Sequence, residues 1–155
     1  MPVSAEQRPE YFELASRILG VGVVHGPSTK CLTLLDGERL PVAVVIYDRI
    51  SRVDCDCHFV TTGVRRWFHQ GFAQWVAHVA FVQYGLRRVT APISASNRPA
   101  LMLARMVGFR EEGRRRQACL DGSDEIVFGM LREECRYLSQ GESYGNGWRR
   151  FGAES

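Results

Sequence analysis

The sequence has no long apolar run: nowhere in its 155 residues do about eighteen apolar residues follow one another. Its first residues, MPVSAEQRPEYFE, carry acidic side chains where a signal peptide would have a basic end and then an apolar block. Both absences argue against a membrane anchor and a secretion signal. We therefore expect a cytoplasmic protein that has no membrane partner.

The sequence also lacks a disulfide framework. Its five cysteines are an odd number and stand at irregular spacing, at positions 31, 55, 57, 119 and 135. This pattern indicates free thiols in a reducing compartment. The group Cys55, Cys57 and His58 does not complete a zinc site, because a structural site needs a fourth ligand and no second Cys/His pair stands nearby. We expect no metal.

A strong charge of one sign is missing as well. The formal net charge is +3, which is too small to indicate nucleic acid by itself. Arginines nevertheless cluster at 65–66, 87–88 and 114–116. These clusters favour local anion sites and leave a nucleic-acid partner open.

The composition that is present fits one globular domain. Hydrophobic residues make up 45% of the chain and charged residues 24%, so a chain of this length can bury a core of its own. We place the domain at residues 1–138. Residues 139–155 are rich in Gly, Ser and Glu and are expected to form a flexible tail.

The apolar pattern predicts strands and helices in mixed order. A helix is expected over residues 9–19, followed by strands at 21–24, 31–35, 42–47 and 57–62. The run 42–47 is apolar without alternation, which predicts a central strand. After residue 63 the apolar spacing becomes helical as far as Gly85, and it is carried by Phe68, Phe72, Trp75, Val76, Val79 and Val82.

The second half continues the alternation. A strand is expected at 88–94, then a helix that is capped by Asn97 and ends at Gly108, and then strands at 114–119 and 126–130. This order predicts an α/β layer fold.

The loop at 62–66 joins a strand to a helix. Such a loop presents free backbone N–H groups and the positive end of the helix dipole, which together bind anions. Arg65 and Arg66 would add two guanidiniums, a combination that suits a pyrophosphate. The alternative is that both arginines form the solvated start of the helix.

The segment 97–113 carries a recognisable order of residues. Asn97-Arg98-Pro99-Ala100 opens the expected helix, and Val107-Gly108-Phe109 and Glu111-Glu112-Gly113 follow it. This order resembles the signature of the GNAT acetyltransferases, with the RimJ/RimL-like branch nearest. The segments 81–89 and 124–137 also look like that family, the second like its strand followed by a glutamate-rich helix. The resemblance covers residues 57–138.

The resemblance implies a mixed, mostly antiparallel sheet with helices on both faces, in which the strands at 57–62 and 88–94 splay apart. The pantetheine arm of acetyl-CoA, the co-substrate, is expected in the gap. Pro92 agrees with this, because proline gives no donor to a ladder and is tolerated where the ladder is broken. The expected cofactor-binding residues are Phe59, Val60, Thr61, Arg65, Arg66, Trp67, Gly71, Asn97 and Arg105. For Trp67 and the aromatic residues after it, helical spacing favours a core stripe over a platform for nucleic-acid bases.

Two positions depart from the pattern of the family. Its pyrophosphate loop has two closely spaced small residues after an Arg or Gln, whereas here only Gly71 follows Arg65 and Arg66. Many members also have a tyrosine that protonates the leaving thiolate, and this chain has Ala104 in that place. RimJ/RimL-like members often lack the tyrosine too, and water can supply the proton.

The catalytic residues are expected on the strand at 57–62 and just before it. His58 and Asp56 are the candidate bases, and with Asp54 they share one face of a regular strand. His58 has the ordinary pKa nearest to neutral. Val60 is expected to supply the backbone N–H that meets the oxyanion. A bulge would instead turn His58 into the core as a packed residue.

The leading hypothesis is an N-acetyltransferase that moves an acetyl group from acetyl-CoA to a primary amine, of a protein or a small molecule, by direct attack in a ternary complex. One alternative is a GNAT-fold protein without turnover that serves as a binding or structural module, for example in a phage particle. Another is a nucleobase modifier like the phage Mom proteins. A homodimer is also left open.

Overall fold

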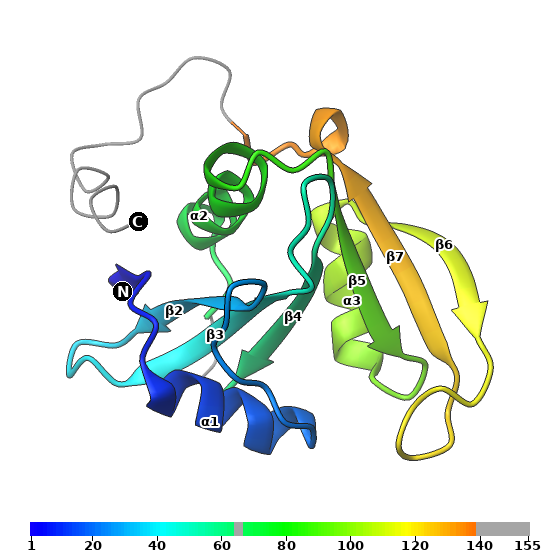
Figure 1. Ribbon diagram of the computed structural model, residues 1–155, viewed down its shortest axis with the longest axis horizontal. Coiled ribbons are helices and arrows are strands. Elements are labelled where there is room, and N and C mark those ends of the chain that lie inside the picture. Colours follow the sequence, from blue (N-terminus) through cyan, green and yellow to red (C-terminus); the bar gives the residue numbers. More distant parts are fainter. Residues whose placement is uncertain (64–66, 139–155) are drawn as a thin grey trace.

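The computed structural model describes residues 1–63 and 67–138, which fold around one seven-stranded sheet (Figure 1). The order across the sheet is β1-β2-β3-β4-β5-β7-β6. The strands are β1 (Val3–Ser4), β2 (Lys30–Leu35), β3 (Pro41–Asp48), β4 (Asp56–Thr61), β5 (Arg88–Ser94), β6 (Arg110–Arg115) and β7 (Glu125–Leu131). The helices are α1 (Pro9–Leu19), α2 (Gln70–His78) and α3 (Arg98–Val107), with a π-helical turn η1 (Val79–Gln83) and a 3₁₀ turn η2 (Arg132–Glu134).

Helices cover both faces of the sheet, as expected. On one face α1 packs against β2, β3 and β4, in a cluster of Tyr11, Phe12, Ala15, Cys31, Leu35, Val44, Ile46 and Val60. On the other face α2 and η1 pack over the alternate residues of the same strands, among them Val45, Tyr47 and Cys57. α3 covers β5 and β7. β3 is buried from Val42 to Tyr47 and lies between β2 and β4, which confirms the predicted central strand.

β4 and β5 are the one parallel pair in the order above, and they touch only at their beginnings. Among the described residues a single pair, Asp56 and Thr90, is in register between the two strands. Beside it the Thr90 N–H donates to the Cys55 carbonyl at 2.9 Å. Figure 1 shows the two strands moving apart from this point toward their arrowheads, with α3 behind the opening. The expected splay is therefore present.

The strand expected at 21–24 does not form. Ser16 in α1 holds this segment instead, because its hydroxyl accepts from the Val23 N–H at 2.8 Å and donates to the Val23 carbonyl. The segment folds back on the end of α1, and the edge partner of β2 is β1.

The strand expected at 114–119 is also misplaced. Gly108 ends α3 with a φ of 104°, and the chain enters β6 almost directly, at Arg110. β6 ends at Arg115 because Asp124 closes the following loop, where its carboxylate accepts from the Gln117 N–H and pairs with Arg114. The strand expected at 126–130 is confirmed as β7, but the short turn η2 stands where the resemblance implied a glutamate-rich helix.

The helix expected after residue 63 begins later and changes its phase. It starts at Gln70, and the His69 Nδ1 accepts from the Phe72 N–H at 3.2 Å as the N-cap. η1 then inserts a wider turn, closed by the bond from the Tyr84 N–H to the Val79 carbonyl. Phe81 is therefore buried, while Val82, which the helical spacing placed on the apolar stripe, is 45% exposed.

None of the helices in residues 1–63 and 67–138 is long and apolar enough to span a membrane. The expected tail, 139–155, lies outside the described residues.

Asn97 caps α3, since its side chain accepts from the Ala100 N–H at 3.3 Å. We expect Asn97→Ala to lower the free energy of unfolding by about 1 kcal/mol, because that N–H loses its partner. Chemical denaturation measures the change. Asn97→Asp keeps an acceptor and should retain most of the stability, and an alanine variant as stable as the parent would contradict the cap.

Candidate active site

The opening between β4 and β5 holds a cavity of about 260 Å³. Both strands, α3 and the end of α1 contribute to its wall. The lining residues are Ile18, Leu19, Cys57, His58, Phe59, Phe68, Ala91, Pro92, Ile93, Ser94, Asn97, Ala100, Leu103, Ala104, Val107 and Phe109. Because the wall includes residues from the α1 face and from the α3 face, the cavity passes through the plane of the sheet.

β4 directs half of its backbone groups into this opening. The Thr62 N–H donates to the Val42 carbonyl across the β3 side, and the Cys55 carbonyl accepts from Thr90 across the β5 side. The register between β3 and β4 is uninterrupted. Backbone direction alternates along an antiparallel strand, so residues 56, 58 and 60 bond toward β3. Phe59 and Thr61 therefore present their N–H and carbonyl groups to the opening.

This alternation corrects one expectation. Val60 was expected to offer its N–H to an oxyanion, but that N–H is directed at β3, and the Val60 side chain is buried in the cluster under α1. The donor that faces the cavity from the middle of β4 is the Phe59 N–H, and the Thr61 N–H points to the same side of β4 beyond the residues that line the cavity.

Pro92 explains why the β4–β5 ladder stops. The N–H of Thr90 bonds to β4, so the next β5 residue whose nitrogen faces β4 is residue 92. Proline has no N–H, so the rung to the Cys57 carbonyl cannot form. The break leaves backbone acceptors and donors of β4 without a strand partner at the cavity wall.

His58 lies half-buried on the α1 face of β4 and lines the cavity. The expected alternation of Asp56, His58 and Val60 on one face is confirmed, because no bulge interrupts β4. Burial lowers the pKa of His58 from its ordinary value of 6.5, and the carboxylates of Asp56, Asp48 and Glu125 oppose that shift. The imidazole is thus favoured in its neutral, proton-accepting form.

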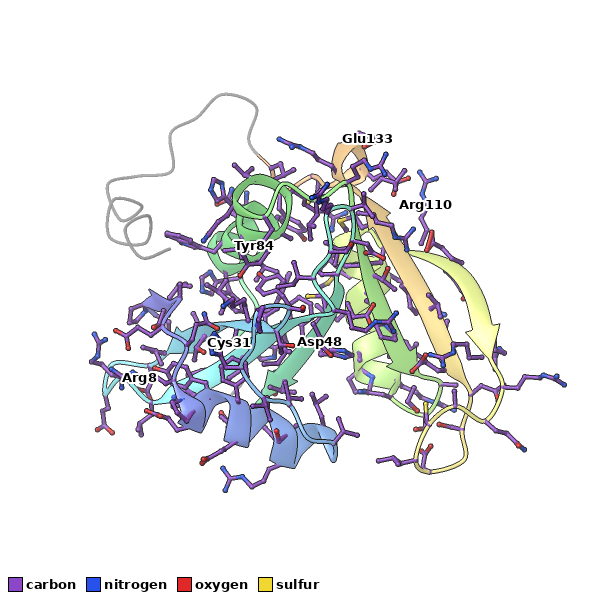
Figure 2. All side chains as sticks on the ribbon, in the orientation of Figure 1. Arg8, Cys31, Asp48, Tyr84, Arg110 and Glu133 are labelled. Atoms are coloured by element: carbon purple, nitrogen blue, oxygen red, sulfur yellow. The ribbon has the colours of Figure 1, made fainter. Side chains whose placement is uncertain are left out.

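Asp56 lies on the same face but does not line the cavity. It stands opposite Asp48 of β3, which is labelled in Figure 2 and accepts a hydrogen bond from the Thr29 hydroxyl at 2.7 Å. Burial raises the pKa of Asp56, while Arg49, 3.6 Å away, and His58 lower it. Asp56 is placed to act on the charge of His58 from one strand position away.

The α3 wall combines a polar cap with small side chains. Asn97 lines the cavity as well as capping the helix, so the expected cap is confirmed. Ala104, which stands where many GNAT members have a tyrosine, lines the same wall. No hydroxyl comes from that position.

The start of α2 is shaped by a glycine. A Cβ on Gly71 would lie 3.3 Å from the His69 Nδ1, so glycine leaves room for the ring that caps the helix. Arg65 and Arg66, the expected pyrophosphate contacts, lie outside the described residues.

Five expected cofactor-binding residues do not line the cavity, namely Val60, Thr61, Trp67, Gly71 and Arg105. Trp67 packs among Phe59, Phe68 and Phe72 with ring centroids 5.7 to 6.3 Å apart, so it belongs to the edge of the core, although it precedes α2 and is not part of a helical stripe. The Thr61 hydroxyl accepts from the Gly63 N–H. Arg105 is exposed on α3, over the Phe128 ring and 3.6 Å from Glu111.

Several lining residues were missed from the sequence. Ile18 and Leu19 come from the last turn of α1, and Ile18 is exposed although it belongs to the apolar face of that helix. In the sequence, an apolar residue at the end of a helix could have indicated that this position lines a cavity. No group of His, Cys, Asp and Glu side chains in residues 1–63 and 67–138 could hold a metal ion, and the cysteines there are free.

No protein-family model and no curated protein matches the sequence. Solved structures of spermidine N-acetyltransferase SpeG from Vibrio cholerae resemble the fold. A chimera of that enzyme with hSSAT has a TM-score of 0.72 at 13% identity, over 90% of this chain and 100% of the other. The enzyme in complex with manganese ions has a TM-score of 0.72 at 12% identity, over 85% and 92% of the two chains. A point mutant has a TM-score of 0.64 at 17% identity, over 76% and 72%. The likeness is one of fold, and the chain has the GNAT fold.

The lowered pKa of His58 makes stability depend on pH. Between the lowered value and 6.5 the unfolded chain binds a proton that the folded chain does not, so stability is lost as the pH falls through 6.5. We expect the free energy of unfolding of His58→Asn to fall less than that of the parent between about pH 7 and about pH 5. Urea denaturation across that range measures it. His25→Asn removes an exposed histidine as the control, and equal slopes for the parent and His58→Asn would contradict the burial cost.

Proposed function

We propose that the chain is an N-acyltransferase that takes an acetyl group from acetyl-CoA and delivers it to a primary amine. The observation that carries the proposal is the broken ladder between β4 and β5, with a through-sheet cavity at the break. The comparisons support the proposal because this chain shares the GNAT fold with proteins named as N-acetyltransferases.

The wall of the cavity fits the donor. A pantetheine arm carries amide groups, and the N–H and carbonyl groups of Phe59 and Thr61 offer a strand edge for them. The N-terminus of α2 lies downstream of the same strand and favours anions. The loop before it contains Arg65 and Arg66, which would add charge-assisted contacts to a pyrophosphate.

The side chains on the α1 face fit the amine. His58, held neutral by burial, would take the proton of the ammonium form, and the carboxylates around it favour a cationic substrate. The amine nitrogen then attacks the thioester carbon and forms the C–N bond, while an N–H from Phe59 or Thr61 meets the oxyanion. Collapse breaks the C–S bond, and because residue 104 is alanine, water would carry the proton that the attacking nitrogen loses to the leaving thiolate.

The acceptor and the biological setting complete the proposal. The acceptor would be a primary amine of a protein or small molecule. Kinship with the RimJ/RimL-like branch, a phage origin, a cytoplasmic location and a homodimer stay predictions.

We expect acetyl-CoA to bind the purified protein, as measured by calorimetry. Reversing both loop charges, Arg65→Glu with Arg66→Glu, should weaken binding at least about tenfold, because two charge-assisted contacts are lost. Arg39→Glu with Arg52→Glu makes the same charge change at exposed positions and is the control. Absence of acetyl-CoA binding would sink the proposal, and binding without thiol release over a panel of amines would favour a module that binds without turnover.

The protonation of His58 should determine how the rate rises with pH on the acidic side of the profile. Because burial lowers its pKa, we expect log kcat/KM to rise with pH up to a value below 6.5, and His58→Ala to flatten that limb. Asp56→Asn removes a carboxylate that raises the pKa of His58, so it should move the limb to lower pH. A His58→Ala enzyme with an unchanged rate and pH profile would reject the role of base.

A further inference from the structure

A second cavity lies beneath α2 and η1, on the side of the sheet opposite α1. It measures about 50 Å³, and it is lined by α2, η1, the strands β3, β4, β5 and β7, the end of α3 and residues after β7. Its exposed wall is entirely apolar. The one hydroxyl brought by β3 is already used, because Tyr47 donates to the Val76 carbonyl at 3.0 Å. An apolar hollow of this size beside a binding edge can receive a small apolar group.

The chamber adjoins the cavity between β4 and β5. The two share five lining residues, Cys57, Phe59, Phe68, Val107 and Phe109. Cys57 and Phe59 belong to the stretch of β4 whose backbone faces the opening. A group bound to that edge of β4 therefore lies at the mouth of the chamber.

Three alanines on the overlying helix keep the chamber open. Ala73, Ala77 and Ala80 stand at steps of four and three residues and line its roof. Val76 and Phe81 of the same helix line the chamber beside them, and the wider turn η1 sets the phase of Phe81. π-helical turns of this kind are frequent at functional sites.

We propose that this chamber receives the acyl chain of the donor, and that the protein, besides acetyl-CoA, also uses and binds more tightly saturated acyl-CoA thioesters that are a few carbons longer. The inference rests on the proposed function, because it places the thioester at the β4 edge. A water-sized group needs roughly 10 to 15 Å³ of such space, so the chamber admits about three carbon groups beyond acetyl. Butyryl and pentanoyl chains fit this limit, and octanoyl exceeds it.

The chamber also selects against polar acyl chains. Within residues 1–63 and 67–138 its wall offers no cation to a terminal carboxylate, and burying that charge without a partner is unfavourable. Succinyl-CoA, which has the same number of acyl carbons as butyryl-CoA, is therefore the matched probe for polarity.

Calorimetry with CoA and its acetyl, butyryl, octanoyl and succinyl thioesters tests the proposal on the full chain. Each buried methylene should tighten binding about fourfold, so butyryl-CoA should bind at least about tenfold tighter than acetyl-CoA. Octanoyl-CoA and succinyl-CoA should each bind at least about tenfold more weakly than butyryl-CoA.

The variant Ala77→Leu fills the chamber. It should reduce the ratio of butyryl-CoA to acetyl-CoA affinity to about one, while its melting temperature stays at or above that of the parent, since the new side chain occupies existing space. Gln74→Leu places the same side chain on the same helix outside the lining and should keep the ratio.

The outcomes separate the two proposals. If no CoA compound binds, the proposed function fails and the chamber proposal fails with it. If acetyl-CoA binds and butyryl-CoA binds no tighter, only the acyl-chain proposal is overturned. The proposal is also overturned if the rate of thiol release depends on the alkyl length of the amine and not on the length of the acyl chain. A clear fall in the melting temperature of Ala77→Leu would overturn it too.

Discussion

The break in the hydrogen-bond ladder between β4 and β5 is the constraint on which the site depends. Two parallel strands that begin in contact would ordinarily continue as a ladder, and Pro92 interrupts it at the first position where β5 should donate again. The antiparallel pairing of β5 with β7 is unaffected, because the nitrogen of residue 92 faces away from β7. One residue thus opens one side of a strand and leaves the other intact.

The junction below the break is fastened by side chains. Thr90 donates its hydroxyl to Asp54 at 2.9 Å, and Arg88 lies 3.4 Å from Asp54 and 2.6 Å from Glu112. Gly129 leaves the space for this pair, since a Cβ there would come within 2.2 Å of the Glu112 carboxylate. These contacts link β6 and β5 to the segment before β4, so the two strands are held together at one end while they diverge at the other.

Sequence patterns found the parts of this arrangement that local chemistry determines. The bounds of β5, the cap at Asn97 and the regular alternation of β4 follow from short-range preferences. The errors came from long-range choices. The segment 21–24 has strand propensity, yet Ser16 captures it, and the stripe after Phe72 loses its phase at η1. Val60 was misassigned because side-chain alternation is visible in a sequence, whereas the edge to which each N–H points depends on which neighbour pairs in which register.

Because side-chain face and backbone direction alternate separately, β4 contacts three different environments. Its even-numbered side chains, His58 among them, face α1, and its odd-numbered side chains, Cys57 and Phe59, face the chamber under α2. The backbone of the odd-numbered residues faces the opening. A shift of the β3–β4 register by one residue would exchange all three roles, because side-chain face and backbone direction both alternate with period two. The apolar cluster under α2 opposes such a shift, since the shift would bury His58 there in place of an apolar side chain.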